Sequence, residues 1–265
     1  MSEVFAEGTW SADLDGASRF SSTGLPSPVV GMREAWGKEA DNWVRLVRAG
    51  LDAGWDFTHP PFMQLLPPPG RLTLDVGCGE GRLGRVLQEA GYTVIGVDVT
   101  VALARAAASH SQRLSVLIAD AAHLAVRDQA ADLVVAFMSL QDIDDFTGAV
   151  HEAARVLEPG GHFCFAIVHP LAEAGRFQED GTFLVDRSYR SVWRYPDHLQ
   201  RKGIEMTFHS EHRPIEAYGR ALEEAGFLIE AFREPVPDEA TVTATAREER
   251  WRRIPNFLMV RARLD

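Results

Sequence analysis

The stretch L-D-V-G-C-G-E-G, residues 74–81, decides the fold of this chain. A short apolar run, residues 72–76, leads into it and a helical pattern, residues 83–90, follows it. The three glycines therefore lie in a turn between a strand and a helix. Glycines at such a turn let the backbone bend tightly and let a ligand approach the main chain. We expect a nucleotide-like ligand at this turn.

The spacing of the glycines and the neighbouring charges narrow the choice of ligand. A dinucleotide loop of the form G-x-G-x-x-G fits poorly, because Arg82 stands at its third glycine position and would crowd a pyrophosphate. No G-K-[ST] follows, which excludes a P-loop. The carboxylate of Asp75 repels phosphate and attracts a cationic group. These features favour a nucleoside ligand with a positive centre and no phosphates, such as S-adenosylmethionine with its sulfonium and α-ammonium groups.

Strand and helix patterns alternate on both sides of the loop. Such repeated βα units predict a parallel sheet with helices on both faces. After a break in this rhythm a helix is expected over 214–225 and two more strands over 227–232 and 257–264. The expected earlier strands are residues 72–76, 93–99, 114–119, 132–138 and 162–168, with helices over 83–90, from 101 onward, and over 142–157.

These motifs resemble those of the class I S-adenosylmethionine-dependent methyltransferases. D-V-G-C-G-E-G resembles the first motif, Val97-Asp98 ends the second strand, and 118–124, 132–137 and 157–163 resemble the later motifs in order. The resemblance covers about residues 70–170. It implies an α/β, Rossmann-like, seven-stranded sheet that is mostly parallel, with helices on both faces and the last strand antiparallel. The run His209 to Pro214 resembles a bacterial subgroup that methylates small molecules.

The resemblance also implies a cofactor site. It places the ribose hydroxyls on Asp98 and the adenine amino group on Asp120. Each aspartate could instead cap a helix, but both stand at the carboxyl edge of consecutive strands, where α/β sheets bind ligands. We interpret Cys78 as a small spacer. The residues expected to bind S-adenosyl-L-methionine are Asp75, Gly77, Cys78, Gly79, Gly81, Asp98, Val99, Asp120, Ala121 and Phe137.

The chain divides into segments by composition. Residues 1–30 are rich in Ser, Gly, Ala and Pro and are expected to form a flexible arm. Residues 31–69 are expected to form a helical cap and a linker. Pro60, Pro61 and the run Pro67 to Pro69 are expected to stop the helix, and that run is expected to be the linker. Residues 70–265 then form the methyltransferase domain. Within it, residues 171–210 break the βα rhythm and are expected to form a lid.

The methyl acceptor is expected to bind between the N-terminal helix and the lid. The lid is rich in aromatic residues, which suit a small and partly apolar ligand. It could instead be a structural flap with its own small core. The candidate acceptor-binding residues are Trp43, Tyr189, Trp193, His209 and His212.

His169 is the candidate catalytic base. It follows the fifth expected strand at the carboxyl edge of the sheet, and an ordinary histidine accepts a proton near neutral pH. A base is needed for a hydroxyl acceptor more than for an amine. The alternative is that His169 only bonds to a loop and shapes the pocket.

Composition restricts the class of partner. The net charge of −11 argues against nucleic acid, and the absence of an 18-residue apolar run argues against a membrane span. No secretory signal is apparent, and two isolated cysteines suit a reducing cytoplasm better than a disulfide framework. No metal site is expected. The oligomeric state is left open.

The leading hypothesis is therefore S-adenosylmethionine-dependent methyl transfer to a small molecule, for example a secondary metabolite. Methylation of tRNA or protein is the alternative within enzymes, and a dense basic stripe would favour it. A non-catalytic S-adenosylmethionine-binding module would need no acceptor pocket. An NAD oxidoreductase is disfavoured by Arg82 and Asp75.

Overall fold

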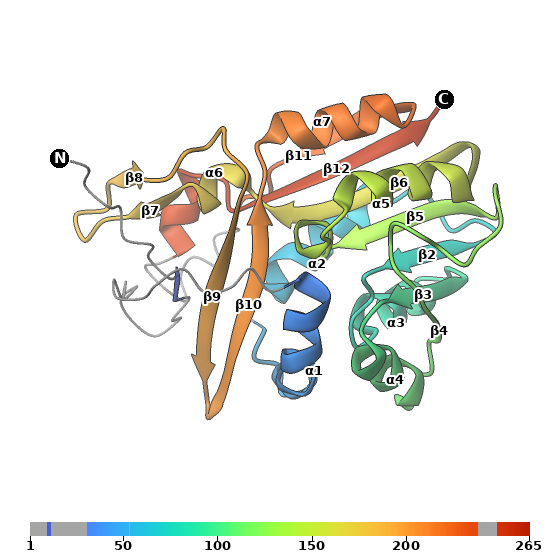
Figure 1. Ribbon diagram of the computed structural model, residues 1–265, viewed down its shortest axis with the longest axis horizontal. Helices are drawn as coiled ribbons and strands as arrows, with labels where there is room; N and C mark the ends of the chain where they lie inside the picture. Colours follow the sequence, from blue (N-terminus) through green and yellow to red (C-terminus); the bar gives the residue numbers. More distant parts are fainter. Residues whose placement is uncertain (1–9, 12–30, 53, 238–247) are drawn as a thin grey trace.

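A seven-stranded sheet forms the centre of the molecule (Figure 1). The computed structural model describes residues 10–11, 31–52, 54–237 and 248–265. The strand order is β11-β12-β6-β5-β2-β3-β4. β12 is antiparallel to both of its neighbours, and the other six strands run in the same direction. This confirms the expected fold class. The strands are Thr73–Val76 (β2), Val94–Asp98 (β3), Ser115–Ile118 (β4), Ala131–Phe137 (β5), Leu157–Val168 (β6), Phe227–Arg233 (β11) and Phe257–Leu264 (β12).

Helices cover both faces of the sheet, as the continuous apolar run of β5 requires. Val134 and Ala136 of β5 pack in one hydrophobic cluster, and Leu133 and Val135 pack in the other. Alternate residues of a strand point to opposite faces, so a strand buried on both faces is apolar throughout. The first cluster takes in Phe146–Val156 (α5) and Ile215–Glu224 (α7), and the second takes in Trp55–Leu65 (α2) and Arg82–Glu89 (α3). Val101–Ser109 (α4) follows β3.

The expectation that Pro60 and Pro61 end the helical structure is wrong. Both prolines lie inside α2. Proline removes a backbone donor and is unfavourable in a helix interior. The burial of Phe62 and Leu65 against the sheet offsets that cost.

The expected helix over 142–157 begins later in the structure. Asp145 is the N-cap of α5, and its carboxylate accepts the Gly148 N–H at 2.8 Å. Asp142 belongs to a preceding turn of 3₁₀ helix, Leu140–Asp142 (η1). The chain enters that turn through Met138, whose φ is +54°. A positive φ is unfavourable for a residue with a Cβ, so the sequence carries no glycine signal for this bend.

The segment 171–210 is structured as β-strands. Pro170–Glu173 (α6) leads into Gly175–Phe177 (β7) and Phe183–Val185 (β8), followed by a long hairpin, Trp193–Arg201 (β9) and Ile204–His212 (β10). The hairpin lies beside Met32–Arg48 (α1) (Figure 1), and Leu46, Leu199, Ile204 and Met206 form a small core between them.

Short elements near the two ends of the chain lie outside the seven-stranded sheet. Of the expected flexible arm, only Trp10–Ser11 (β1), which pairs in parallel with β9, falls within the described residues. A short 3₁₀ helix, Glu248–Arg252 (η2), precedes β12. In the described part of the chain, no helix has the length and apolar character needed to cross a membrane.

Candidate active site

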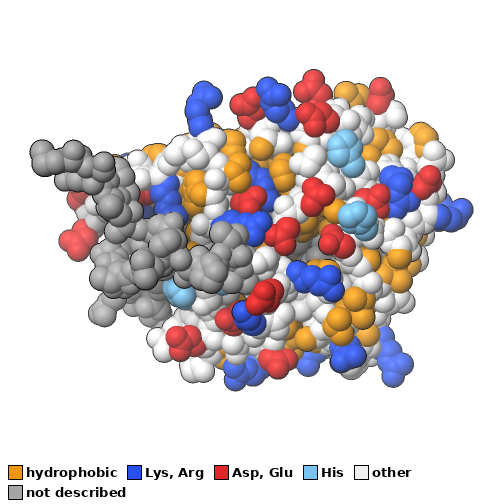
Figure 2. Space-filling model, in the orientation of Figure 1, with side chains coloured by type: hydrophobic (Ala, Val, Ile, Leu, Met, Phe, Trp, Pro, Cys, Tyr) orange, Lys and Arg blue, Asp and Glu red, His pale blue; other side chains and the backbone are white. Residues whose placement is uncertain are grey.

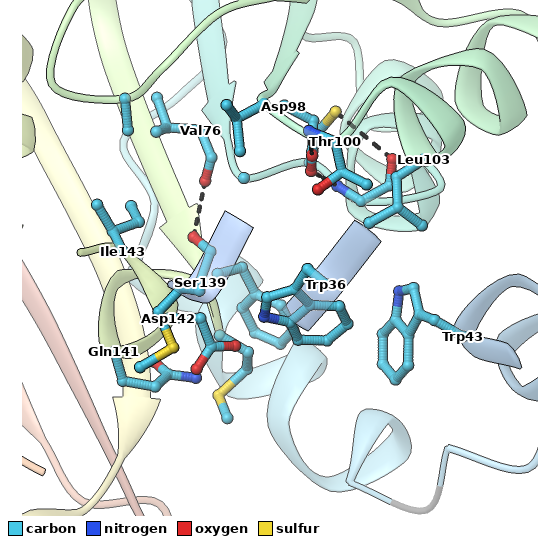
Figure 3. Close-up of a pocket in the computed structure, with 18 of the residues that line it drawn as sticks. Trp36, Trp43, Val76, Asp98, Thr100, Leu103, Ser139, Gln141, Asp142 and Ile143 are labelled. Atoms are coloured by element: carbon cyan, nitrogen blue, oxygen red, sulfur yellow. Dashed lines mark hydrogen bonds between the residues drawn. The ribbon is translucent and has the colours of Figure 1, made fainter. Parts of the chain in front are cut away.

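A cavity of about 450 Å³ lies at the carboxyl edge of β2, β3 and β5. The helix α1, the hairpin β9–β10, α2 and η1 also contribute to its wall. Figure 3 shows Trp36 and Trp43 of α1 at the cavity. Its volume falls in the range of about 300–1,000 Å³ that is usual for ligand pockets. The structure brings together all of the expected cofactor-binding residues except Gly81: Asp75, Gly77, Cys78, Gly79, Asp98, Val99, Asp120, Ala121 and Phe137.

The glycine loop presents bare backbone to this cavity. Gly77 has φ +72°, and a Cβ there would lie 2.4 Å from the Cβ of Ser139. Ser139 in turn donates a hydrogen bond of 2.7 Å to the carbonyl of Val76 (Figure 3). A Cβ on Gly79 would lie 3.3 Å from Nε1 of Trp43, so the indole covers the loop directly. Gly81 is the N-cap of α3, and a Cβ there would lie 2.9 Å from the Cβ of Ala107.

Asp98 ties the glycine loop to the end of β3. Its Oδ2 accepts the Gly79 N–H at 2.8 Å, and its Oδ1 accepts the Thr100 N–H at 2.8 Å. Burial raises the pKa of this carboxyl, and these two N–H groups oppose the rise. Each carboxylate oxygen has a second lone pair, so the side chain can also accept hydrogen bonds from a ligand. The loop-ordering role and the ligand role are therefore compatible.

Asp75 adds a second desolvated carboxyl group to the site. The side chain is buried, and its Oδ2 has no hydrogen-bond partner among the described residues. Burial, and then the neighbouring charge of Asp98, raise the pKa of Asp75 to about 7, against a weaker effect of the Gly84 N–H. Two desolvated carboxyls at one site favour a cationic ligand and disfavour a pyrophosphate. The residues present thus fit S-adenosylmethionine.

Arg82 is held away from a phosphate-binding role. Its guanidinium pairs with Asp52 at 3.2 Å and stacks 3.9 Å from the ring centroid of Trp55. This connects the first turn of α3 to α2.

The cofactor end of the cavity also includes Asp120, Phe137 and Cys78. Asp120 accepts the Ala122 N–H at 2.9 Å. Phe137 packs against Trp55 and Phe62, with centroids 5.7 and 4.9 Å away. Burial and nearby carboxylates raise the pKa of Cys78 well above its ordinary value, which keeps it a thiol and not a nucleophile.

The opposite end of the cavity has an aromatic and acidic wall. Trp36 and Trp43 from α1 and Phe208 from β10 pack edge to face, with all three centroid distances at 5.8 Å. The hairpin adds Tyr195, Asp197 and Ser210, and η1 adds Gln141 and Asp142. The sequence alone did not predict a place in the site for Trp36, Tyr195, Phe208, Gln141 or Asp142.

Of the expected acceptor-binding residues, only Trp43 lines the cavity. His209 alternates along β10 with Phe208 and Ser210, which do line it, so its side chain faces the other side of the strand. His212, Tyr189 and Trp193 form a support behind the wall. The His212 ring stacks on Trp193 at 4.7 Å and contacts the carbonyl oxygen of Tyr189 through Nε2 at 2.9 Å.

His169 has the contacts of a helix cap. Its Nδ1 accepts the Leu171 N–H at 3.0 Å, and its Nε2 lies 3.0 Å from Oε1 of Glu234. The ring is buried and is not part of the cavity lining. Burial lowers its pKa. Because both nitrogens are engaged away from the cavity, the geometry corrects the choice of His169 as base and favours the alternative role at the loop.

Asp142 of η1 is a carboxyl group at the acceptor end of the cavity. Its Oδ1 accepts the Ser210 hydroxyl at 2.6 Å, and the side chain borders the cavity. Desolvation raises the pKa of Asp142 to about 7, while hydrogen bonding from Ser210 opposes the rise, Glu173 adds to it, and Arg213 and Trp36 lower it. A carboxyl that titrates near neutral pH is suited to accept a proton.

Comparisons with known proteins agree with this site. Residues 74–165 match the family model described as a methyltransferase domain. A ubiquinone biosynthesis O-methyltransferase of Alkalilimnicola ehrlichii is 34% identical over 105 residues, which cover 38% of this chain and 42% of that protein. The methyltransferase GfsG of Streptomyces halstedii is 29% identical over 170 residues, covering 58% of this chain and 60% of that protein. The matches thus span less than two thirds of these relatives.

A solved structure extends the likeness to most of the fold. The S-adenosylmethionine-dependent methyltransferase from Mesorhizobium loti superimposes with a TM-score of 0.65 and 29% identity, over 77% of this chain and 96% of that one. The likeness therefore includes strands beyond the matched family segment. Its D-x-G-x-G-x-G loop, its strand order and these relatives make the chain similar to the class I S-adenosylmethionine-dependent methyltransferases, with a methyltransferase domain over residues 74–165.

Proposed function

We propose that this chain transfers a methyl group from S-adenosylmethionine to a small-molecule acceptor bound in the same cavity. One observation carries the proposal: a single cavity joins the glycine loop and Asp98 to the wall formed by Trp36, Phe208 and Asp142. A module that only bound the cofactor would not need that second end. The relatives named above include an enzyme of ubiquinone biosynthesis, which favours a small acceptor.

Each part of the cavity has a definable task in this reaction. The cofactor, when bound, supplies an electrophilic methyl group. Asp98 and Asp120 are suited to the ribose and the adenine, and the charge of Asp75 favours the positive centre. The rings of α1 and β10 exclude water and limit how an acceptor can lie. Such positioning contributes up to about 7–11 kcal/mol to a bimolecular reaction.

A macromolecular acceptor is the second candidate, and the face in Figure 2 gives it no support. On the face that Figure 2 shows, basic and acidic side chains of the described residues are interspersed without a continuous basic stripe. Binding to a nucleic-acid backbone depends on such a stripe. The net charge of −11 also argues against a nucleic-acid acceptor.

Calorimetry with S-adenosylhomocysteine and NAD tests the cofactor. We expect binding of the first and none of the second, and Asp98→Ala should weaken binding by about 1–3 kcal/mol because it removes a charged acceptor. Asp128→Ala, at an exposed site outside the cavity, is the control. Micromolar binding of NAD without binding of S-adenosylhomocysteine would refute the cofactor assignment.

Methyl transfer itself needs a separate assay. Protein incubated with methyl-labelled S-adenosylmethionine and a fractionated metabolite extract should give a labelled small product. Label found only in tRNA or protein would favour the second candidate. Cofactor binding with no labelled product in any fraction would favour a non-catalytic binding module.

A further inference from the structure

Two side chains that accept hydrogen bonds lie together at the end of the cavity proposed for the methyl acceptor. Gln141 and Asp142 are successive residues of η1, and both line the cavity. Gln141 is only 4% exposed, and its Oε1 has no hydrogen-bond partner within the described part of the chain. Figure 3 shows both side chains on the same side of the cavity, next to Trp36. A buried acceptor without a donor is costly, so this pair calls for a ligand rich in N–H or O–H groups.

Two basic side chains behind this wall, Arg213 and His212, are paired with other groups. Arg213 lowers the pKa of Asp142, but its guanidinium binds Glu211 at 2.5 Å and the Ile143 carbonyl at 3.1 Å. His212 lies 3.0 Å from Glu173 through Nδ1. Among the described residues, Asp142 itself forms no ion pair within 4.0 Å. Its negative charge is therefore available to a ligand.

The surrounding wall is suited to a positive charge. Trp36, Trp43 and Phe208 form the edge-to-face cluster beside the carboxyl, and aromatic faces attract cations by about 0.5–2 kcal/mol. The hairpin adds Asp197 to the same lining. An anionic acceptor would meet this acidic wall unfavourably.

We propose that the methyl acceptor is an amine that enters as its ammonium ion, held by the carboxylate of Asp142 and the amide oxygen of Gln141 against the rings of Trp36 and Phe208. The proposal rests on the proposed function and names its class of acceptor. A primary ammonium ion carries three N–H donors and one positive charge, which match two acceptors and one unneutralised carboxylate. A hydroxyl carries one donor and no charge, so it leaves the carboxylate without a counter-ion.

The same contact gives the proton of the ammonium ion a destination. One N–H bond breaks, the proton passes to the Asp142 carboxylate, and its electron pair stays on nitrogen. The products are a neutral amine with a free lone pair and a protonated Asp142. Methyl transfer requires that lone pair, so binding and deprotonation are served by one residue.

The test compares three probes of similar shape and different charge: benzylamine, benzyl alcohol and benzoate. Each is titrated at pH 8 into protein saturated with S-adenosylhomocysteine, so that the cofactor end is filled. Calorimetry gives the affinity, and tryptophan fluorescence reports on Trp36 and Trp43. We expect benzylamine to bind about tenfold or more tightly than benzyl alcohol, with benzoate weakest.

Two near-isosteric variants test the residues. In Asp142→Asn, the affinity for benzylamine should fall to within about threefold of the affinity for benzyl alcohol. In Gln141→Met, the affinity for benzylamine alone should fall. Each variant removes one hydrogen-bond acceptor for the ammonium ion. Asp128→Asn removes one negative charge from an exposed site and should leave the preference unchanged. Affinity for S-adenosylhomocysteine confirms that each variant is folded.

The outcomes separate this inference from the proposed function. Equal or tighter binding of benzyl alcohol, absence of benzylamine binding at millimolar concentration, or a preference that persists in Asp142→Asn would overturn the ammonium site. Failure of the unaltered protein to bind S-adenosylhomocysteine would instead count against the proposed function. The three probes would then be compared on the protein alone, with the same outcomes deciding the inference.

Discussion

At the scale of single residues, the cavity is marked by carboxyl groups whose removal from water disfavours their charged form. Asp75, Asp98 and Asp142 all have raised pKa values, and removal from water is the first cause for each. A protein stabilises such groups with donors or with a ligand. Asp98 accepts two backbone N–H groups and Asp142 accepts two side-chain donors, Ser210 and Trp36, whereas Oδ2 of Asp75 has no partner among the described residues. Their arrangement suits a cavity that receives positive charge.

A substitution at Gly77 would test the close approach of the glycine loop to Ser139, the N-cap of η1. In Gly77→Ala, the new Cβ would collide with Ser139 and the residue would have to keep φ +72°. We expect a loss of about 1–3 kcal/mol in the free energy of unfolding and weaker binding of S-adenosylhomocysteine, measured by denaturant titration and calorimetry. Gly160→Ala is the matched control, since Gly160 has φ +79° with no heavy atom within 4 Å of the added Cβ. Equal effects of the two variants would show that steric contact with Ser139 is unimportant.

Asp142 should make stability depend on pH with a definite sign. Its pKa is about 7 in the folded protein and about 3.8 in the unfolded chain, so the folded state binds the proton more tightly. The resulting stabilisation is present below about pH 4 and is lost as the pH rises through 7, amounting to about 4 kcal/mol at most. Asp142→Asn removes this dependence. The difference in unfolding free energy between the two proteins, measured from pH 4 to 8, should therefore move in favour of the variant as pH rises, and a constant difference would contradict the shift.

At the scale of elements, the hairpin β9–β10 and α1 close the cavity together. The Thr207 N–H donates to Glu39 at 3.1 Å, and Arg201 donates to the carbonyl of Leu51. With the small core around Leu46 and Met206, these contacts make the pair one packed unit. The insert thus has the core of a structural flap and also contributes residues to the cavity.

Whether this unit opens for ligands is a prediction for hydrogen exchange. We expect backbone amides of 193–212 and 32–48 to exchange more slowly when S-adenosylhomocysteine and benzylamine are bound together, because ligand contacts on both elements must break for them to separate. The central strand β5 serves as the internal reference, and its amides should slow only as far as the ligands stabilise the whole fold. Equally slow exchange of the hairpin with and without ligands would identify a rigid flap.

At the scale of the whole molecule, the sheet determines where the cavity lies. The chain order reverses between β2 and β5, and the carboxyl ends of these neighbouring parallel strands leave a crevice there. The antiparallel β12 fills the space between β6 and β11 and extends the sheet on the far side. The glycine loop and η1 meet at this crevice because β2 and β5 are paired.

Ligand binding should stabilise the whole fold, since the cavity walls come from elements throughout the chain. S-adenosylhomocysteine at 100 times its dissociation constant should add about 2.7 kcal/mol to the free energy of unfolding and raise the melting temperature. NAD at the same concentration should not. A melting temperature that is unchanged by S-adenosylhomocysteine, with Asp98→Ala behaving like the unaltered protein, would contradict binding at this site.

The sequence by itself determined the cofactor half of the molecule. The glycine loop, the acids after β3 and β4, and the apolar strands are local patterns, because each strand, turn and helix is encoded by neighbouring residues. Asp75, Gly77, Gly79, Asp98 and Asp120 were therefore found without the structure, and all of them line the cavity.

Only the tertiary structure decided which residues line the end of the cavity proposed for the methyl acceptor. Trp36, Asp142 and Phe208 come from a helix, a short turn and a hairpin far apart in the chain, so no local period connects them. The sequence predicts that Asp142 begins a helix, whereas in the structure it belongs to η1, which follows the positive-φ bend at Met138. The histidines were chosen for their chemistry, yet strand alternation turns His209 away, and helix capping and burial engage His169 and His212. Which side of an element faces a cavity depends on what packs against it, and that is settled when the sheet, α1 and the hairpin come together.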